Sequence, residues 1–426
     1  MGEGSYKTRK SCMLNGALAT VNAISGLVPI VHSNPGCGVQ GFAAGFSDGT
    51  GLGGARILCS DVSERHIIFG GASRLREELK NAARVVNAEA FIVLNGCEAA
   101  MVADDIASMT EEAREQGISV IFSGSTGFHG GAHTGYESVL TELLKEFSEG
   151  ALRERTEEDG LSVNIFGVLP GRSAHARGDL NRIEDILAPY AIRANTFFYR
   201  KEGISGLKRS GRAALSLVFS KWGEKPARYL AEHFQIPCLT MPCVPSGAEE
   251  VAKLKQSILE KLRIGTEGGC CPDDRTNRIR ERYYENLQGI RELYYTEGLN
   301  RRAAVVGDEA EAVQAATVLS TILNMEIATM IITDGDTDHP VGKVPYELSQ
   351  EVVVTEDERM IEEHIEKSRA EVIIGSSLEK ELAHTLQIPL VEAFFPLSDR
   401  IILTETYAGT EGALCLIEKV ISKILR

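Results

Sequence analysis

Short apolar runs alternate with amphipathic helical patterns along the whole chain. Near the start, the strand-like runs lie at Leu27–His32, Ala90–Leu94 and Ser119–Phe122, and each is followed by Gly, Pro, Ser or Asn and then by a helical pattern. The repeated order of strand, turn and helix indicates a parallel sheet with helices on both faces. We therefore expect a first α/β domain at residues 1–155.

The same alternation continues after a charged stretch at residues 152–160. We expect a second domain at 156–298, ending in a charged helical bridge at 266–298, and a third at 299–426. Together the patterns predict an α/β fold of three doubly wound, parallel-sheet (Rossmann-like) domains. The strands and helices behind this prediction are Leu161–Phe166, Leu180–Leu187, Pro226–Phe234, Ile236–Met241, Arg302–Val306, Glu309–Asn324, Ile327–Thr333, Glu371–Ile374 and Gly412–Leu425.

The composition is that of a globular protein, and it narrows the range of partners. Of the 426 residues, 43% are hydrophobic and 25% are charged, and the formal net charge is −15. An acidic chain lacks the basic footprint that nucleic acids and anionic membranes need, so we expect it to bind neither. No apolar run reaches the roughly 20 residues that span a bilayer, and the first residues lack the apolar segment of a secretory signal, which predicts a cytoplasmic protein.

Nine cysteines, an odd number in a long chain, indicate reduced thiols rather than a disulfide framework. Cys12, Cys37 and Cys97 lie where helices are expected to begin, the last two after strands. Open parallel sheets bind ligands at the carboxyl ends of their strands, so these thiols can converge. A helix N-terminus also lowers the pKa of a thiol, and the thiolate is the form that binds metal. The competing interpretation is that each is a small buried hydrophobe. That interpretation is favoured for the other cysteines in strand-like or helical runs, which are Cys59, Cys238, Cys243 and Cys415.

The surroundings of these three cysteines resemble the nitrogenase component-one family. Cys12 precedes a Gly-Ala pair, Cys37 ends a His-Ser-Asn-Pro-Gly-Cys run, and Cys97 precedes Ala-Asp-Asp at 103–105. The intervals of 25 and 60 residues between the cysteines match the family's pattern of cluster ligands. Three longer stretches are also similar to the family, and they are Ser60–Leu79, Gly127–Leu140 and Pro389–Gly412.

The resemblance implies that Cys12, Cys37 and Cys97 hold an iron–sulfur cluster, either of the P-cluster type or a single [4Fe–4S] cubane. Three thiolates leave a cubane one ligand short, so the remainder would come from a partner chain. The family's α-type chains add a cofactor-binding Cys and a His. Phe219 or Ser220 stands in the Cys position, and no His lies near residues 394–407. The resemblance therefore implies a β-type subunit with no catalytic residue of its own.

The implied partners are an α-type subunit in an α2β2 heterotetramer and, transiently, an ATP-dependent iron–sulfur reductase protein. Eleven residues precede Cys12, fewer than in the family's β-type arm, and Gly127 stands near the position of a supplementary serine ligand. These departures favour a nitrogenase-like relative, such as a methylthio-alkane reductase or a tetrapyrrole reductase, over a standard dinitrogen-reducing enzyme. The resemblance leaves three substrates open: dinitrogen, a methylthio-alkane or a tetrapyrrole. Two alternatives stay open: a cofactor-assembly scaffold and a metal-free structural homologue.

Other motifs carry weaker signals. Residues 49–54 match G-x-G-x-x-G, but they neither follow a strand nor open a helix, so a glycine loop is favoured over a nucleotide site. His129 and His133 are expected to be hydrogen-bonded loop residues rather than metal ligands. Asp104 and Asp105 are neighbours that do not face each other on a helix, so we expect them to cap it or contact the partner. Adjacent Cys270 and Cys271, in a polar loop, are poor joint ligands of one metal.

Overall fold

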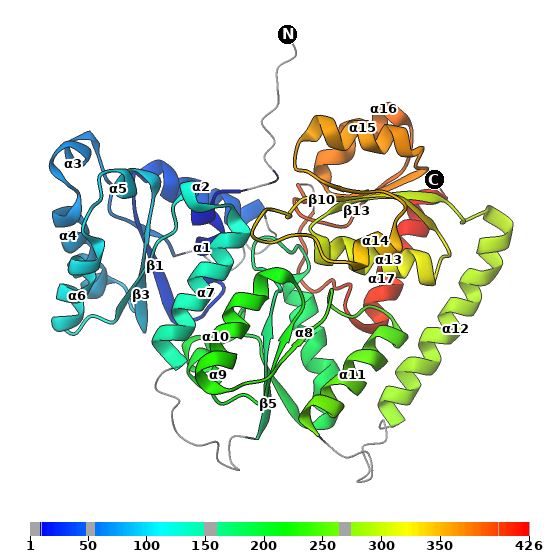
Figure 1. Ribbon diagram of the computed structural model, residues 1–426, viewed down its shortest axis with the longest axis horizontal. Coiled ribbons are helices and arrows are strands. Elements are labelled where there is room, and N and C mark those ends of the chain that lie inside the picture. The colour runs from blue at the N-terminus through cyan, green and yellow to red at the C-terminus, as the bar shows by residue number, and fades with distance from the viewer. Residues whose placement is uncertain are drawn as a thin grey trace.

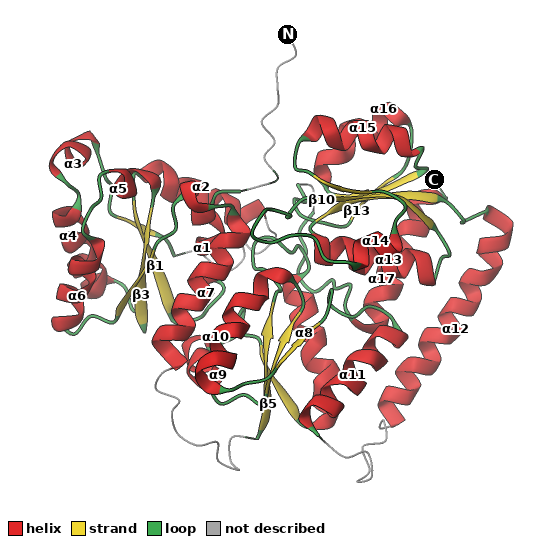
Figure 2. Cartoon of the chain, viewed as in Figure 1, coloured by secondary structure: helices red, strands yellow, loops and turns green. Residues whose placement is uncertain are grey.

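A computed structural model describes residue 9 and residues 11–47, 56–148, 160–263, 274–398 and 400–425. Within them the chain forms three separate sheets, and every strand pair in all three is parallel. Helices cover the sheets on both faces (Figures 1 and 2). The predicted fold class is therefore confirmed. The glycine motif at 49–54 and the pair Cys270–Cys271 lie outside the described residues.

The first sheet has the strand order β2-β1-β3-β4. Its two central strands are buried at every position, as expected for strands covered on both faces. Its strands are β1 (Leu27–His32), β2 (Leu58–Cys59), β3 (Ala90–Asn95) and β4 (Val120–Ser123). Its helices are α1 (Met13–Asn22), α2 (Pro35–Ser47), α3 (Glu64–Phe69), α4 (Ala72–Val85), α5 (Cys97–Met101), α6 (Ile106–Glu115) and α7 (Ala132–Ser148).

The second sheet has the order β6-β5-β7-β8 and lies below the other two in Figure 1. Its strands are β5 (Leu161–Phe166), β6 (Ile192–Asn195), β7 (Leu215–Val218) and β8 (Cys238–Thr240). Its helices are α8 (Ala176–Leu187), α9 (Gly203–Ser210), α10 (Glu224–Phe234) and α11 (Ala248–Leu262).

The third sheet has the order β11-β10-β9-β12-β13. The long helix α12 (Asp274–Glu297) descends on the right of Figure 1, from the level of this sheet to the lower end of α11. The strands of the third sheet are β9 (Arg302–Gly307), β10 (Glu326–Ile332), β11 (Val352–Val354), β12 (Val372–Gly375) and β13 (Leu390–Glu392). Its helices are α13 (Glu309–Thr321), α14 (Val344–Leu348), α15 (Glu358–Ser368), α16 (Lys380–Leu386) and α17 (Gly409–Ile424).

The strands predicted from apolar runs are present, and β1 and β5 have the predicted bounds. The four strands that the sequence patterns missed are short, and they are β6, β7, β11 and β13. The domain boundaries at 155 and 298 stay predictions. In the part of the chain that the structure describes, no helix has the length and apolar character needed to cross a membrane.

Helices α1 and α7 cross at a point where both present glycine. A Cβ on Gly16 would collide with the backbone of Ala132, and a Cβ on Gly135 would collide with the backbone of Met13. This close contact brings the start of α1 against the start of α7, where Cys12 forms a β-bridge with Gly131. The same helices belong to one apolar core that continues from the first sheet into the second.

Each sheet has a point where the strand order reverses, between β1 and β3, between β5 and β7, and between β9 and β12. Two connections leave such a point in opposite directions, so a crevice opens beyond the carboxyl ends of the two strands. These three crevices hold the polar groups and thiols described next.

Candidate functional site

The three predicted cysteines gather at the crevice of the first sheet. Cys37 lies in the first turn of α2 after β1, Cys97 is the first residue of α5 after β3, and Cys12 caps α1. Gly127 lies between two of the sulfurs, because a Cβ there would be 3.1 Å from Sγ of Cys12 and 3.4 Å from Sγ of Cys97. Cys37 is also close enough to Cys12 to disfavour its ionisation.

Burial raises the pKa of the Cys12 thiol, and the neighbouring thiols of Cys97 and Cys37 add to the effect. The backbone N–H groups of Leu14 and Asn15 at the start of α1 act in the opposite direction but do not outweigh burial. The start of the helix thus lowers the pKa of Cys12, as expected, but burial raises it by more. The partial positive charge at the start of α1 is too weak to keep the Cys12 thiol ionised. A bound metal ion would do so, because a thiol that coordinates a metal loses its proton.

Side chains hold the turns around the thiols in place. Asn95 at the end of β3 accepts a hydrogen bond from the backbone N–H of Ser125 at 2.9 Å, which fixes the loop that carries Gly127. Cys59 on β2 directs its thiol to the backbone oxygen of Ser33 at 3.4 Å, so it supports the turn before Cys37. Cys59 is thus a strand residue, as predicted.

His32 is fully buried between two polar partners. Its Nδ1 lies 2.8 Å from Oγ of Ser60 and its Nε2 lies 3.1 Å from Oδ2 of Asp104, and burial lowers its pKa. Asp104 also accepts the backbone N–H of Gly71 at 2.7 Å, so it joins the end of β1 to the start of α4. Asp105 caps α6 through the N–H of Ser108, which confirms the predicted capping role for Asp105.

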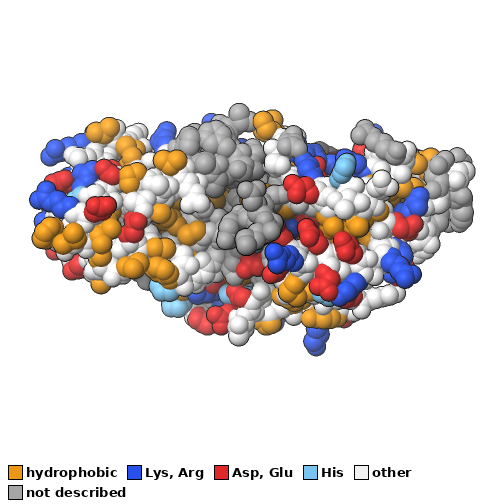
Figure 3. Space-filling view, turned by 90° about the horizontal axis from the view of Figure 1, so that it is seen from above, with side chains coloured by type: hydrophobic (Ala, Val, Ile, Leu, Met, Phe, Trp, Pro, Cys, Tyr) orange, Lys and Arg blue, Asp and Glu red, His pale blue; other side chains and the backbone are white. Residues whose placement is uncertain are grey.

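The arrangement fits a thiolate-bound iron–sulfur group. Sulfur donors are the ligands that such clusters take, and all three are half-buried rather than sealed in the core. Gly127 leaves space between two sulfurs that any side chain would fill. Seen from above, apolar side chains gather over the end of the molecule formed by the first α/β unit (Figure 3). Three exposed apolar residues lie close in sequence to the cysteines or to Gly127, and they are Val39, Met101 and Phe128.

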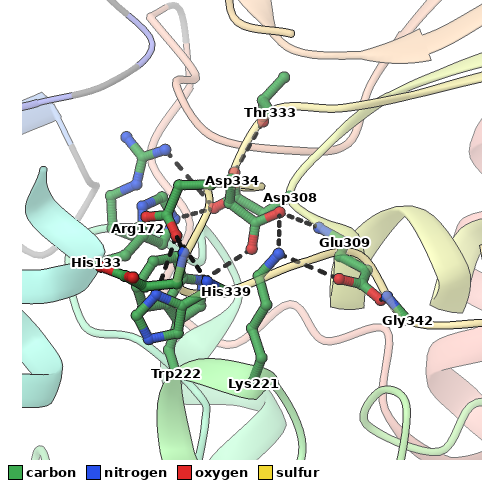
Figure 4. A network of polar contacts seen from close by, with 12 residues as sticks. His133, Arg172, Lys221, Trp222, Asp308, Glu309, Thr333, Asp334, His339 and Gly342 are labelled. Atoms are coloured by element: carbon green, nitrogen blue, oxygen red, sulfur yellow. Dashed lines mark hydrogen bonds and ion pairs between the residues drawn. The ribbon is translucent and has the colours of Figure 1, made fainter. Parts of the chain in front are cut away.

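A second cluster of polar side chains lies where the three sheets meet (Figure 4). We call it the interdomain network, and its members are His133, Arg172, Lys221, Trp222, Asp308 and Asp334. His133 comes from the first turn of α7, whereas the others follow β5, β7, β9 and β10 at the carboxyl ends of the second and third sheets. The sequence patterns did not predict this network.

Asp308 is the centre of one half of the network. Its Oδ2 lies 2.6 Å from Nε2 of His133 and 3.6 Å from a guanidinium nitrogen of Arg172, and its Oδ1 accepts the hydroxyl of Thr333 at 2.8 Å. Burial opposes the ionisation of Asp308, but His133 and Arg172 outweigh it and lower its pKa far below the usual range. His133 is hydrogen-bonded, as predicted, although it lies on a helix and not in a loop.

Asp334 is the centre of the other half. It accepts hydrogen bonds from Nε1 of Trp222 and from the backbone N–H of Glu309, both at 2.8 Å. The Nζ of Lys221 lies 3.5 Å from Asp334 and 3.1 Å from Glu309. Figure 4 shows these groups pointing toward one another from different elements.

The network does not fit a metal ion, although ligand atoms of His133, Asp308 and Asp334 lie within 4.8 Å of one another. Each of the three already has a protein partner, and the cations Arg172 and Lys221 balance the two carboxylates. A divalent ion would have to displace these cations. The interdomain network therefore has a structural role, because it links the three sheets through side-chain hydrogen bonds and ion pairs.

Beside the network lies a cavity of about 50 Å³. Phe219, which is fully buried, and Ser220 line it, and one of these two residues is expected from the resemblance to stand in the position of the α-type cofactor cysteine. A water molecule needs roughly 10–15 Å³ by this measure, so the cavity holds a few waters at most. Burial and the neighbouring Asp308 raise the pKa of Glu311, another lining residue, well above its usual value.

Comparisons with known proteins cover nearly the whole chain. A family model described as nitrogenase component 1 type oxidoreductase matches residues 12–425. The chain is 22% identical over 430 residues to the nitrogenase vanadium-iron protein beta chain of Trichormus variabilis, covering 92% of this chain and 87% of that protein. It is 24% identical over 362 residues to a light-independent protochlorophyllide reductase subunit of Prosthecochloris aestuarii, covering 82% of this chain and 66% of that protein. A solved structure described as nitrogenase Cp1 at pH 6.5 has the same fold, with a TM-score of 0.79 at 18% identity over all of this chain and 94% of that one.

Proposed function

Because the chain belongs to the family of nitrogenase component 1 type oxidoreductases, we propose that it is the β-type subunit of a nitrogenase or nitrogenase-like two-component reductase. In this proposal Cys12, Cys37 and Cys97 hold an iron–sulfur cluster that is shared with an α-type partner. The observation that carries it is the convergence of three half-buried thiols from three separate turns. Cys12 and Cys97 flank Gly127, and Cys37 is close enough to Cys12 to raise the pKa of that thiol.

The surface around the thiols supports a shared cluster. Val39, Met101 and Phe128 are 67%, 74% and 64% exposed, and all lie within four residues of a cysteine or of Gly127. Exposed apolar side chains that gather on one surface mark protein interfaces. A partner that covers them would also supply the ligands that three thiolates leave missing and would exclude water.

The cavity near Phe219 supports the β-type assignment. Ligand pockets in proteins occupy about 300–1,000 Å³, whereas this cavity measures about 50 Å³. A substrate-reducing cofactor would not fit there, so substrate would be reduced in the α-type chain. This chain would then contribute no catalytic residue.

The residues of this chain would hold and insulate the electron carrier. When bound, an iron–sulfur cluster supplies the capacity to take up and release single electrons. Electrons would arrive from an ATP-dependent iron–sulfur reductase protein that docks transiently. The proposed assembly is an α2β2 heterotetramer in the cytoplasm, and the substrate is dinitrogen, a methylthio-alkane or a tetrapyrrole.

The test is to purify the chain anaerobically, alone and coexpressed with an α-type subunit, from cells with a working cluster-assembly system. We expect a brown heteromeric complex with iron and acid-labile sulfide, and little stable cluster on the chain alone. Colourless, iron-free complex would refute the cluster. A homodimer with the cluster across its two-fold axis would preserve the interface but refute the β-type assignment. A loaded complex that transfers its cofactor to another protein, and turns over no substrate with the reductase protein, would favour the cofactor-assembly scaffold instead.

A further inference from the structure

The turns that carry Cys37 and Cys97 lie against each other. The backbone N–H of Gly96 donates to the backbone oxygen of His32 at 3.0 Å, which joins the ends of β3 and β1. Gly96 is packed so closely on Ser33 that a Cβ would collide with its hydroxyl. The two turns are thus in direct contact immediately before Cys97 and four residues before Cys37.

Glu98, next to Cys97, reaches across this contact. Its Oε2 accepts the backbone N–H of Asn34 at 3.1 Å and the hydroxyl of Ser33 at 3.4 Å, and its Oε1 accepts the side-chain amide of Asn34. The Oδ1 of Asn34 in turn accepts the backbone N–H of Cys37 at 3.2 Å. We call this chain of contacts the Glu98–Asn34 bridge, and it connects one ligand cysteine to the next.

The partners of Glu98 are all donors, and they match a carboxylate. An ionised carboxyl group offers only acceptor sites, whereas a glutamine at the same place would turn an NH2 group toward one of the donors. The bridge therefore needs both the length and the charge of glutamate. A shorter or neutral side chain cannot satisfy both Asn34 groups at once.

We propose that Glu98 is a positioning residue for the cluster, which fixes the turns of Cys37 and Cys97 relative to each other and places a negative charge beside the electron carrier. This inference rests on the proposed function. A negative charge close to a redox centre disfavours the added electron, so Glu98 also lowers the reduction potential of the site. A role in folding alone would not affect the potential.

The test is a polarity swap in the coexpressed, cluster-loaded complex. Glu98→Gln breaks the bridge and removes the charge, and Asn34→Asp breaks it by placing two carboxylates together. In the double variant, the side-chain NH2 group introduced at position 98 can donate to the carboxylate introduced at position 34. The side-chain oxygen at position 98 can accept the backbone N–H of residue 34. The oxygen that accepts the N–H of Cys37 is kept, and the total charge is restored. Glu115→Gln, on an exposed position of α6, makes the same charge change away from the site.

Each protein is analysed for three properties: its iron content, the electron paramagnetic resonance spectrum of the reduced cluster, and the midpoint potential of the cluster. We expect Glu98→Gln to retain several-fold less cluster, with an altered spectrum and a more positive potential. We expect Asn34→Asp to lose cluster as well, the double variant to recover cluster and potential, and Glu115→Gln to match the wild type.

Two results would overturn the inference: a Glu98→Gln protein with wild-type spectrum and potential, or a double variant as impaired as the single ones. If Glu98→Gln is insoluble, Asn34→Asp and the double variant make the same comparison. A wild-type complex without iron would instead count against the proposed function, so the two failures are distinct.

Discussion

His133 and Asp308 are separated by 175 residues in the chain, and their side chains meet with 2.6 Å between Nε2 and Oδ2. This contact joins α7, which packs on the first sheet, to the carboxyl end of β9 in the third. Arg172, from the end of β5 in the second sheet, lies at the same carboxylate. One carboxyl group is therefore in contact with side chains from all three α/β units.

Asp308→Ala should destabilise the protein by about 3–5 kcal/mol, because it leaves the buried cation Arg172 and His133 without their partner. Asp338→Ala, at an exposed position near the network, should change stability by no more than about 0.5 kcal/mol. Urea denaturation of both variants measures the difference. Equal stability of the two variants would show that the network does not tie the sheets together.

If Cys97 is a cluster ligand, as proposed, Cys97→Ala should lose most of the iron and sulfide of the complex. Cys238→Ala on β8 and Cys415→Ala on α17 should keep both, since the loss of these half-buried thiols costs on the order of 1–2 kcal/mol at most and no metal bond. Iron and sulfide analysis of the three purified complexes decides the point. Similar iron loss in all three would mean that the ligands are misassigned.

Gly127→Ala should weaken the cluster without unfolding the chain, because its methyl group would lie 3.1 and 3.4 Å from the sulfurs of Cys12 and Cys97. We expect several-fold lower iron content and an altered spectrum. Gly289→Ala, inside α12 with open space around it, is the matched control, and it should stabilise the helix by roughly 0.5–1 kcal/mol. Full cluster occupancy in Gly127→Ala would place the cluster elsewhere.

Phe128→Ser should weaken association with the α-type partner, because Phe128 is a large exposed apolar side chain beside Gly127. Val85→Ser, at the end of α4 and 83% exposed, is the control and should associate normally. Sedimentation of the coexpressed chains at several concentrations measures the change. Unchanged association of the Phe128 variant would remove this surface from the interface.

The stability of the folded chain should fall in mild acid because of His175. Burial lowers its pKa to about 4, so between pH 6.5 and 4 the unfolded chain binds a proton that the folded chain does not. The stability that depends on neutral His175 is fully present above pH 6.5 and is lost as pH falls toward 4. The free energy of unfolding should change by up to about 3 kcal/mol over this range. The stability of His175→Gln relative to the wild type should therefore improve over that range. Burial raises the pKa of Asp179 to about 6, which acts in the opposite direction, but it affects both proteins and cancels in the comparison.

The apolar runs predicted the central strands of the first and third sheets well because these strands are buried and read as continuous hydrophobic stretches. The central strand β7 of the second sheet was missed although it is buried at every position, since it is only four residues long and Ser216 interrupts its apolar run. The edge strands β6 and β11 were missed because they are short and half-exposed, so their patterns resemble those of loops. The cysteines could be brought together from sequence because each lies at a strand–helix junction or helix start of one domain.

The interdomain network was missed because its members come from three domains and share no spacing. One signal was present: Asp308 and Asp334 are the first carboxylates after two predicted strands of the third domain. Side chains that follow strands of a parallel sheet lie at the same edge of that sheet, and this rule applies to Asp308 and Asp334 as it does to the cysteines. The sequence alone could not reveal the reversal of strand order or the side-chain partners, because both depend on how the sheets pack.

Cys12 belongs to the first α/β unit, but its neighbour Arg9 is held by the other two. The Arg9 guanidinium is buried against Glu379 after β12, and its backbone oxygen accepts a hydrogen bond from Arg172 at 2.7 Å. Cys37 and Cys97 follow strands of the first sheet only. Cys12 itself pairs with Gly131 of the first unit. The short segment from Arg9 to Cys12 therefore connects the thiol site to all three α/β units, so a change in how the units pack would act on the thiol site through this segment.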